Sequence, residues 1–503
     1  MSQTKKKSTI KNMFIMGVYQ IVTVVVGFTV PKLLLSTYGA EIHGYTSTVT
    51  TIMSYIALLN AGLSSAAVQS LYAPLAKRNQ KQISAALKAI DRMYIKTGFL
   101  YIIAVVCCAT VLPFVIKSGI SRVQIFGLML VMGASNTMEC FIYSKYRVLL
   151  QADQKLYVVT IGDIAALVVR CILQVVLIGH KASILLVQLV PLCMVFLRMF
   201  IVASYCRKFY ILDRNVKPDY NAVSNRKSAF VHQIASLVVN NTDTIILTIL
   251  CSLTQVSIYS VYNLVCAHIN SLISYVFQHS VVASFGHLYS DSKQEHLNLV
   301  FRTYEYIYMM AISIIFSATA VLLYPFVDLY TNAMKEIQYA NFVYTCLFVC
   351  VGLANNIRIP CLMLINATGM FKETQRQAIL EAVLNITISL CLVKNMGISG
   401  LLIGTFVSFL YRTTDIILFS SKNILKESSA ISLRRSLRTL VVILITYFIC
   451  SKIINISMIC SWNKWILTGI ISTCIASITT LILNYVFERK EFKNTIHYVL
   501  GKL

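Results

Sequence analysis

The chain has 503 residues, of which 57% are hydrophobic and only 13% charged, and its mean hydropathy is +0.73. Water-soluble domains of ordinary size cannot bury so much apolar surface, so the composition excludes a soluble protein. The net charge of +25 would suit a nucleic-acid partner, but no nucleic-acid-binding motif accompanies it. The chain is therefore expected to lie in a membrane and to bind no nucleic acid.

Apolar segments of roughly 20 residues recur along the whole chain, which is the length a helix needs to cross about 30 Å of hydrocarbon. The short alternating strands of a membrane barrel are absent from the sequence. We therefore expect an all-α integral membrane protein with about 14 transmembrane helices. The predicted spans are 13–35, 45–68, 95–116, 123–142, 157–178, 183–205, 228–250, 255–280, 304–326, 339–365, 378–395, 398–419, 439–460 and 465–487.

Lysine and arginine fall on alternate connections between these spans. Basic clusters follow the N-terminus, the second span, the sixth span and the twelfth span, as at Lys5, Lys77, Arg207 and Arg434. Because basic loops stay on the cytoplasmic side, we expect both termini in the cytoplasm and contacts between these clusters and anionic membrane lipids. The first span has no small-residue cleavage site after it, so we expect it to be retained.

The loops between the predicted spans contain no recognisable active site. They contain no glycine-rich phosphate motif, the cysteines lack metal-binding spacing, and no loop is long enough for a catalytic domain. We therefore expect no catalytic residue, no metal, no cofactor and no enzyme activity, but a membrane transporter.

An internal repeat divides the chain. Sliding the sequence against itself so that Tyr45 meets Tyr259 also brings Gln80 onto Gln294. Two six-helix bundles in the same orientation, with a cavity between them, are a transporter architecture. The predicted organisation is a first bundle, a basic cytoplasmic linker, a second bundle, a second basic linker, two additional helices and a cytoplasmic tail, at 1–206, 207–227, 228–421, 422–438, 439–487 and 488–503.

Ionisable and polar residues inside the spans are candidates for substrate and ion binding, since they are costly in lipid. In the fifth span Asp163, Arg170 and Gln174 fall on one helical stripe. Asn240 and Asp243 lie near the middle of the seventh span.

Three further spans contribute candidates. The tenth contains Asn356 and Arg358 shortly before Pro360, which can bend the helix and so suits a gate. Gln20 belongs to a polar stripe in the first span, and His268 lies in the eighth. For His268, an interhelical hydrogen bond and proton handling stay open as alternatives.

Charged residues close to span ends have simpler explanations. Arg412 with Asp415, and Arg198 near its own span end, are explained by a structural pair or by side chains that reach the interface. Glu381 and Glu139 suit an interface position as well as a functional one. Cavity exposure is favoured for Arg170, Asp243 and Arg358, which are the strongest candidates.

Three segments resemble a known family. VPKLLLSTYGAEIHGYTS at 30–47, LLQADQK at 149–155 and NNTDTIILTILCSLTQVSIYSVYNLV at 240–265 are similar to stretches of polysaccharide biosynthesis flippases. These Wzx-like exporters of O-antigen, capsule and exopolysaccharide belong to the multidrug/oligosaccharidyl-lipid/polysaccharide (MOP) superfamily, which includes MATE-like transporters.

The resemblance implies a flippase for undecaprenyl-diphosphate-linked oligosaccharides in the bacterial plasma membrane, acting in O-antigen or other lipopolysaccharide and surface polysaccharide biosynthesis. It implies H⁺ or Na⁺ as coupling ion, and a polysaccharide polymerase and a chain-length regulator as partners. Substrate binding is expected at Arg170, Arg358, Gln20, Gln174, Asn240 and Asn356. Ion coupling is expected at Asp243, Asp163 and His268.

One departure from the related lipid II flippases concerns their arginines. Those proteins are expected to carry arginines in spans one, two and eight, where this chain has Gln20, Asn60 and His268. The departure argues against a lipid II substrate. The alternatives are a MATE-like cation-coupled exporter of another amphiphilic substrate and a polysaccharide polymerase, and the short outward loops disfavour the polymerase.

Overall fold

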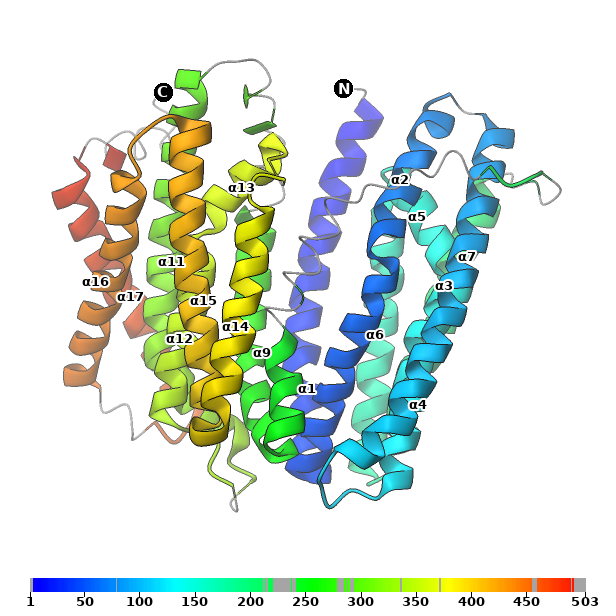
Figure 1. Ribbon diagram of the computed structural model, residues 1–503, viewed down its shortest axis with the longest axis horizontal. Helices are drawn as coiled ribbons and strands as arrows, with labels where there is room; N and C mark the ends of the chain where they lie inside the picture. Colours follow the sequence, from blue (N-terminus) through cyan, green and yellow to red (C-terminus); the bar gives the residue numbers. More distant parts are fainter. Residues whose placement is uncertain are drawn as a thin grey trace. The chain divides into compact units, whose positions relative to one another are not determined.

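Helices dominate the computed structural model of the chain (Figure 1). The structure describes residues 3–77, 79–210, 213, 216–219, 237, 241–277, 285–286, 288–289, 294–334, 337–370, 372–454, 459–489 and 491–492. The helices are α1 Gln3–Ile56, α2 Ala61–Ala76, α3 Gln80–Val115, α4 Arg122–Ile142, α5 Ser144–Ala152, α6 Leu156–Gly179, α7 Ile184–Phe209, α9 Leu253–Phe277, α11 Gln294–Thr331, α12 Phe342–Ile357, α13 Ile359–Thr368, α14 Gln375–Met396, α15 Ile398–Phe419, α16 Ala430–Ile453 and α17 Trp462–Phe487.

Twelve stretches among the described residues are long and apolar enough to cross a membrane. One of them, Phe14–Asn60, has 47 residues, which would extend about 70 Å as a single helix, roughly twice the hydrocarbon thickness. It is interrupted at Gly39, whose φ of 86° is non-helical. The ribbon reverses direction there, so α1 holds two legs (Figure 1).

The predicted seventh span, 228–250, lies mostly outside the described residues. Its described end is the short apolar helix Asn241–Leu250. The chain is thus an all-helical, multi-pass integral membrane protein with twelve candidate spans in its described part, and the predicted count of fourteen is not confirmed.

The chain forms two compact units, Met1–Ser260 and Val261–Leu503, which divide inside α9. The predicted linker, 207–227, lies largely outside the described residues, so the six-part organisation stays a prediction.

In the first unit, α1 packs against α6, α3 against α4, and α7 against both α4 and α6. The core between them includes Tyr45, which is fully buried and donates to the carbonyl oxygen of Ile125 at 2.6 Å. Its hydroxyl is therefore satisfied in the apolar interior, as a buried phenol requires.

Hydrogen bonds connect the N-terminal part of α1 to the corner between α5 and α6. Asn12 donates to the carbonyl oxygen of Gln154 at 3.1 Å and accepts from the backbone N–H of Tyr157 at 2.8 Å. Asp153 accepts from Tyr210 and pairs with Lys155 at 2.7 Å. Burial raises the pKa of the Tyr210 hydroxyl, and the bond to Asp153 raises it further, so Tyr210 stays a donor. The LLQADQK segment therefore builds a structural corner.

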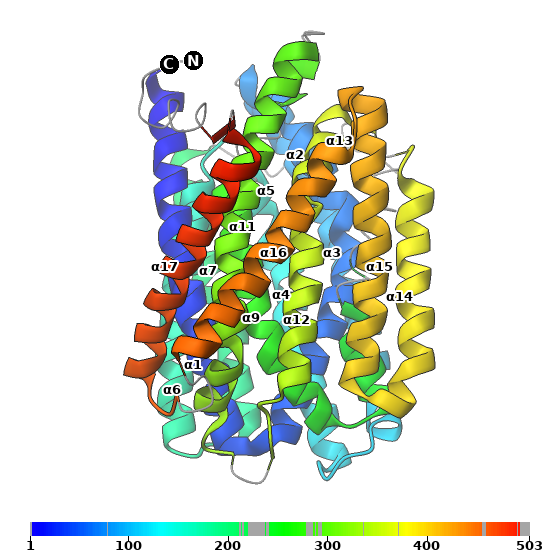
Figure 2. The ribbon, with the colours of Figure 1, turned by 90° about the vertical axis from the view of Figure 1, so that its left-hand side faces the viewer.

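In the second unit, α14 and α15 form a hairpin, and α11 packs against α12, α16 and α17 (Figure 2). Gly397, with a φ of 54°, makes the turn between α14 and α15. A Cβ on Gly404 would overlap the side chain of Ser389, so the glycine allows these two helices to approach closely.

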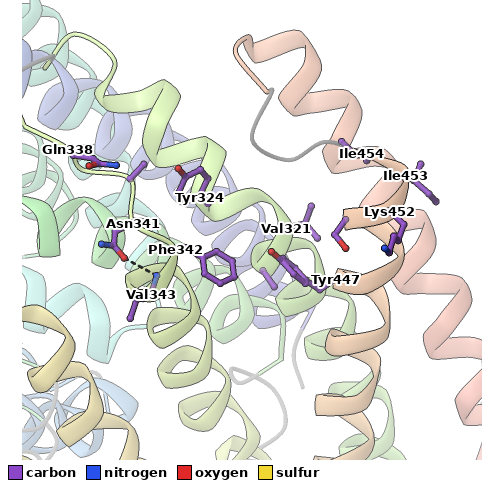
Figure 3. Close-up of a pocket in the computed structure, with 13 residues that line it drawn as sticks. Val321, Tyr324, Gln338, Asn341, Phe342, Val343, Tyr447, Lys452, Ile453 and Ile454 are labelled. Carbon is purple, nitrogen blue, oxygen red and sulfur yellow. Dashed lines mark hydrogen bonds between the residues drawn. The ribbon is translucent and has the colours of Figure 1, made fainter.

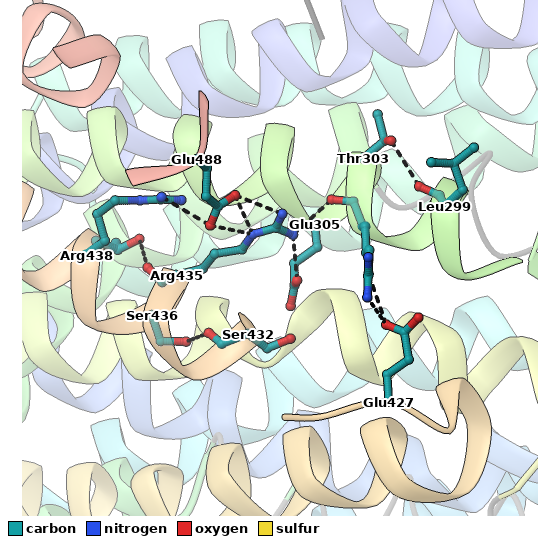
Figure 4. Close-up of polar contacts among 11 residues, drawn as sticks. Leu299, Thr303, Glu305, Glu427, Ser432, Arg435, Ser436, Arg438 and Glu488 are labelled. Carbon is teal, nitrogen blue, oxygen red and sulfur yellow. Dashed lines mark hydrogen bonds and ion pairs between the residues drawn. The ribbon is translucent and has the colours of Figure 1, made fainter. Parts of the chain in front are cut away.

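Buried charges hold the last two helices of this unit (Figure 4). Arg435 of α16 is 1% exposed and donates to Glu305 of α11 at 2.8 Å and to Glu488, just after α17, at 2.9 Å. Arg438 pairs with Glu488 at 3.1 Å. Nearby, Arg302 pairs with Glu427 at 2.7 Å. Ion pairs therefore join α11, α16 and the end of α17.

Helix positions follow the predicted repeat. The helices α3 and α11 begin at Gln80 and Gln294, and α7 and α15 begin at Ile184 and Ile398. Both pairs are offset by 214 residues, which is also the separation of His43 and Ser257. The short helices α5 and α13 occupy matching places in the order of elements. This common register supports the repeat that the sequence predicts.

Candidate functional site

A polar cavity of about 440 Å³ opens inside the first unit. It lies among α1, α4, α6 and α7, with one wall completed by α5. Its lining residues are Tyr19, Thr50, Met132, Ser135, Asn136, Glu139, Arg147, Asp163, Ala166, Leu167, Arg170, Gln188, Pro191, Met194 and Arg198. We call this space the first-unit cavity.

Ion pairs join four helices around the cavity. Arg198 of α7 lies 3.3 Å from Glu139 of α4 and 3.6 Å from Asp163 of α6. Arg147 of α5 lies 3.6 Å from Glu139. These N–O distances exceed those of a tight charge-assisted hydrogen bond, which is about 2.8 Å. The carboxylates are therefore not bound tightly to one cation, and Glu139 is shared between Arg147 and Arg198.

Tyr143 supports this network from the connection between α4 and α5. Its hydroxyl donates to Asp163 at 3.3 Å, and its ring lies 5.3 Å from the guanidinium of Arg198. Burial raises the pKa of Tyr143, and the charge of Asp163 raises it further. The phenol consequently remains a hydrogen-bond donor to the carboxylate.

Arg170 reaches the same cavity from α6 without a carboxylate. Its Nε donates to the Oε1 of Gln174 at 3.0 Å, and Gln174 donates in turn to the carbonyl oxygen of Val187 at 3.2 Å. Gln174 is fully buried. Within the described part of the chain, Arg170 has no ion pair.

The cavity lining is therefore positive in sum, with three arginines and two carboxylates. Glu139 and Asp163 are engaged with Arg198, whereas Arg170 is oriented by an uncharged amide. An arginine held in place with its donors available suits an oxyanion, because the planar guanidinium offers several N–H groups.

A second group of buried charges lies in the second unit. Glu381 of α14 accepts from Arg358 and lies 3.5 Å from Arg412, which also pairs with Asp415. The ring of Phe409 stacks under Arg358, with 4.5 Å from the guanidinium carbon to the ring centroid. We call these residues the second-unit charge cluster. Its charges balance, so it has no surplus for an anion.

The repeat relates the two groups of charges. The offset of 214 residues between His43 and Ser257 also places Arg198 on Arg412. Both arginines lie in corresponding helices, α7 and α15, and both bridge two carboxylates. The sequence alone suggested only snorkelling or a structural pair for them, and applying the repeat to charged residues would have singled them out.

Asp243 occupies a different place from the first-unit cavity. It is 2% exposed and accepts from the hydroxyl of Tyr259 at 3.0 Å. Its neighbour Thr242 lies 2.6 Å from the hydroxyl of Tyr55. The structure therefore does not bring Asp243 together with Asp163.

Side-chain hydrogen bonds continue along the second leg of α1. The hydroxyls of Thr48 and Thr248 lie 2.8 Å apart, and so do His43 Nδ1 and Ser257 Oγ. A Cβ on Gly44 would overlap the carbonyl oxygen of Leu253. We call the pairs His43–Ser257, Thr48–Thr248 and Tyr55–Thr242 the polar zipper.

The remaining predicted residues have other surroundings. Asn356 donates to Asn270 at 2.7 Å and accepts from Tyr308 at 3.2 Å, which makes it a structural node of the second unit. His268 is partly buried in α9. Gln20 adjoins Tyr19, which lines the first-unit cavity, but does not line it itself. Asn240 lies outside the described residues.

The described residues include no cluster of three histidine, cysteine or acidic side chains that could hold a metal ion. The sites above consist of guanidinium groups, carboxylates, amides and hydroxyls. Such groups can bind an anion, a proton or a small cation.

Solved transporter structures share this fold. The lipid II flippase MurJ in an inward closed conformation matches with a TM-score of 0.64 at 14% identity, over 94% of this chain and 98% of its own. An inward-facing multidrug resistance MATE family transporter matches with a TM-score of 0.55 at 13% identity, over 80% and 94%.

A MOP superfamily transporter from Pyrococcus furiosus, whose binding pocket has reversed polarity, matches with a TM-score of 0.54 at 13% identity, over 84% and 97%. No protein-family model and no curated sequence matches the chain. The protein therefore has the fold of MOP superfamily transporters, and at these identities the likeness concerns the fold.

Proposed function

We propose that the protein is a flippase that moves undecaprenyl-diphosphate-linked oligosaccharides from the cytoplasmic to the outer leaflet of a bacterial plasma membrane. It would act by alternating access, with both termini in the cytoplasm, in surface polysaccharide biosynthesis. The observation that carries this proposal is the first-unit cavity, where Arg170 is positioned by Gln174 and has no carboxylate partner among the described residues.

The physical demand of the reaction matches such a cavity. A diphosphate and a hydrated sugar must cross hydrocarbon, and their transfer to an apolar medium is costly unless charges and hydrogen bonds are matched. Arg170 would bind an oxyanion, while Asn136 and Gln188 of the cavity lining offer amides for sugar hydroxyls. A volume of about 440 Å³ suits the diphosphate and adjoining sugar, with the prenyl chain remaining in lipid.

Coupling to an ion would use the carboxylates of the same cavity. Protonation of Asp163 or Glu139 would release Arg198 from one of its two partners. The surplus positive charge of the cavity would then rise by one, which favours an anionic substrate. Asp243, which does not line this cavity, and His268, which belongs to the second unit, are the less direct candidates for this role.

A MATE-like exporter of another amphiphilic substrate is the second candidate. The carboxylates Glu139 and Asp163 are the observation that favours it, since acidic groups in a cavity can bind a cation. Both carboxylates are already paired with Arg198. The pairing favours an anion over a cation as substrate.

Transport by purified protein in sealed vesicles tests the proposal. The vesicles would carry an undecaprenyl-diphosphate-linked oligosaccharide, and a membrane-impermeant oxidant of sugar diols would report how much reaches the outer leaflet. We expect Arg170→Ala to reduce the rate about ten- to a hundredfold, since hydrogen bonds to charged groups contribute about 1.5–3 kcal/mol.

Arg434→Ala is the matched control, because Arg434 is an exposed arginine at the start of α16. It should transport at the normal rate. No accelerated movement by the unsubstituted protein would refute the flippase function, whereas normal movement in Arg170→Ala would refute only the assignment of the cavity.

A further inference from the structure

A second cavity lies in the second unit, where Phe342 lines it at the opposite end of α12 from Arg358 of the second-unit charge cluster. It has a volume of about 980 Å³ and opens between α11, the start of α12 and the end of α16 (Figure 3). Its polar groups come from Tyr324, Gln338, Asn341, Tyr447, Ser451 and Lys452. Its apolar walls come from Val321, Phe342, Val343, Ile453 and Ile454. The space is therefore amphipathic, and we call it the outer pocket.

The depth of this pocket follows from α16. Lys452 lies about 33 Å along that helix from its first residue, Ala430, at 1.5 Å per residue. The hydrocarbon core of a bilayer is about 30 Å thick. Since Arg434 and Arg438 near the start of α16 belong at one interface, Lys452 lies at the opposite one, at the level of lipid headgroups.

Both tryptophans of the chain mark the same level. Trp465 donates to the carbonyl oxygen of Leu322, beside the pocket residue Val321, at 3.1 Å. Trp462 and Trp465 also pack on Phe326 of α11, with ring centroids 5.9 Å and 5.6 Å apart. Tryptophan and tyrosine concentrate at membrane–water interfaces, and Tyr324 and Tyr447 of the pocket fit this pattern.

Charge favours one kind of occupant. Among the described residues that line the outer pocket, Lys452 alone is charged. The side chain of Lys452 runs over the ring of Phe448, 5.7 Å from its centroid. Exposed apolar residues flank the opening, including Phe448 at 63% and Phe342 at 53%, and acyl chains can lie against them. A basic pocket between transmembrane helices at headgroup depth suits an anionic lipid.

The geometry points to a binding site for an anionic glycerophospholipid of the surrounding leaflet. Its phosphate contacts the Lys452 ammonium, its glycerol and ester oxygens contact Tyr324, Tyr447 and Ser451, and its acyl chains lie against Phe342 and Ile453. The site shares no lining residue with the first-unit cavity and does not depend on what the protein transports. Such a lipid would hold α16 against α11 and α12.

Intrinsic fluorescence offers a direct test, because the only two tryptophans lie beside the pocket. The full chain would be reconstituted in phosphatidylcholine with increasing brominated phosphatidylglycerol or, separately, brominated phosphatidylcholine. We expect phosphatidylglycerol to quench at lower mole fraction, by about fivefold for one basic residue at the membrane surface.

Lys452→Gln should abolish this preference, and Lys452→Arg should keep it. Lys464→Gln is the matched control, since Lys464 is exposed on α17 at the same end of the unit and does not line the pocket. A cooperative thermal unfolding transition would show that each variant is folded.

Equal quenching by both lipids, or an undiminished preference in Lys452→Gln, would overturn the proposal. Undecaprenyl phosphate or inorganic phosphate would be added as competitors. If either removes the quenching at concentrations far below that of the phospholipid, the pocket binds another anion and the proposal fails. No displacement at matched concentration supports the phospholipid.

Discussion

His43 Nδ1 lies 2.8 Å from Ser257 Oγ, and the two residues are separated by 214 positions, the offset of the repeat. Residues that correspond in two repeats meet only where the repeats adjoin, as equivalent residues do near a symmetry axis. The polar zipper therefore lies where the second leg of α1 contacts the first described helices of the second repeat. Alternating access requires the repeats to separate on one side.

Cross-linking the polar zipper should stop transport. Thr48→Cys with Thr248→Cys, in a variant whose native cysteines are replaced, places two thiols where hydroxyls lie 2.8 Å apart. We expect oxidation to reduce vesicle transport at least tenfold and a reductant to restore it, because a covalent bond prevents the two segments from parting. Each single-cysteine variant should be insensitive to oxidant. Full activity of the cross-linked protein would contradict a moving contact here.

Gly44→Ala should destabilise the protein. The added methyl group would overlap the backbone carbonyl of Leu253, and overpacking of this kind costs about 1–3 kcal/mol. Gly179→Ala is the control, because a Cβ there meets no atom within 4 Å. The thermal unfolding midpoint in detergent should be lower for Gly44→Ala than for Gly179→Ala. Equal midpoints would show that the backbone at Leu253 shifts at little cost to admit the methyl group.

Gln174→Glu should inactivate the cavity without removing Arg170. The new carboxylate would lie against the Arg170 guanidinium, which now contacts the amide oxygen of Gln174 at 3.0 Å. The surplus positive charge would vanish, so we expect a loss of transport similar to that of Arg170→Ala. Gln174→Leu removes only the orienting bond and should have a smaller effect. Normal rates in Gln174→Glu would indicate that Arg170 does not meet the substrate.

Glu381→Leu should destabilise the second unit strongly. Glu381 accepts from Arg358 and lies 3.5 Å from Arg412, and both guanidinium groups would remain buried without it. Removing one member of a buried pair costs about 3–5 kcal/mol. Glu373→Leu, at an exposed position just before α14, should shift stability by no more than about 0.5 kcal/mol. Similar unfolding midpoints would mean that the cluster is hydrated.

Arg435→Met should loosen the last two helices. The substitution leaves Glu305 and Glu488 without the bonds of 2.8 Å and 2.9 Å that Arg435 donates, at a cost of about 3–5 kcal/mol. Limited proteolysis between Leu425 and Ala430 should accelerate as α16 detaches. The adjacent, exposed Arg434 provides the control in Arg434→Met, and equal cleavage of both variants would argue against this anchor.

The sequence was informative about helices and their repetition because both depend on local chemistry. Apolar length predicts a membrane helix wherever it occurs, and the register of Gln80 and Gln294 is visible in the residues themselves. The kink at Gly39 also falls between two predicted spans. The spacing of Asp163, Arg170 and Gln174 places them along one stripe of α6; Asp163 and Arg170 line the first-unit cavity, whereas Gln174 does not line it and accepts a hydrogen bond from Arg170.

The sequence did not show which charged residues of different helices would pair with one another. Arg358 was expected in a cavity, but Glu381 of another helix pairs with it, and helix packing decides such a meeting. For Glu139 the sequence left an interface and a functional position open, and for Arg198 it favoured snorkelling or a structural pair, whereas the bundle brings both to the first-unit cavity. Two of the segments that resemble the flippase family have structural roles. Asp153 belongs to the corner between α5 and α6, and Gly44 allows α1 to approach Leu253. Packing constrains a sequence as tightly as binding does.

The bond between Arg435 and Glu305 also sets an order of events during synthesis. The two residues are 130 positions apart, so a ribosome adding 5–20 residues per second makes Glu305 on the order of 10 s before its arginine. During that interval α11 carries a carboxylate that has no counter-charge for burial. The nascent helix must keep Glu305 protonated or in contact with water until α16 arrives, which makes the C-terminal helices a late step in assembly rather than an appendage.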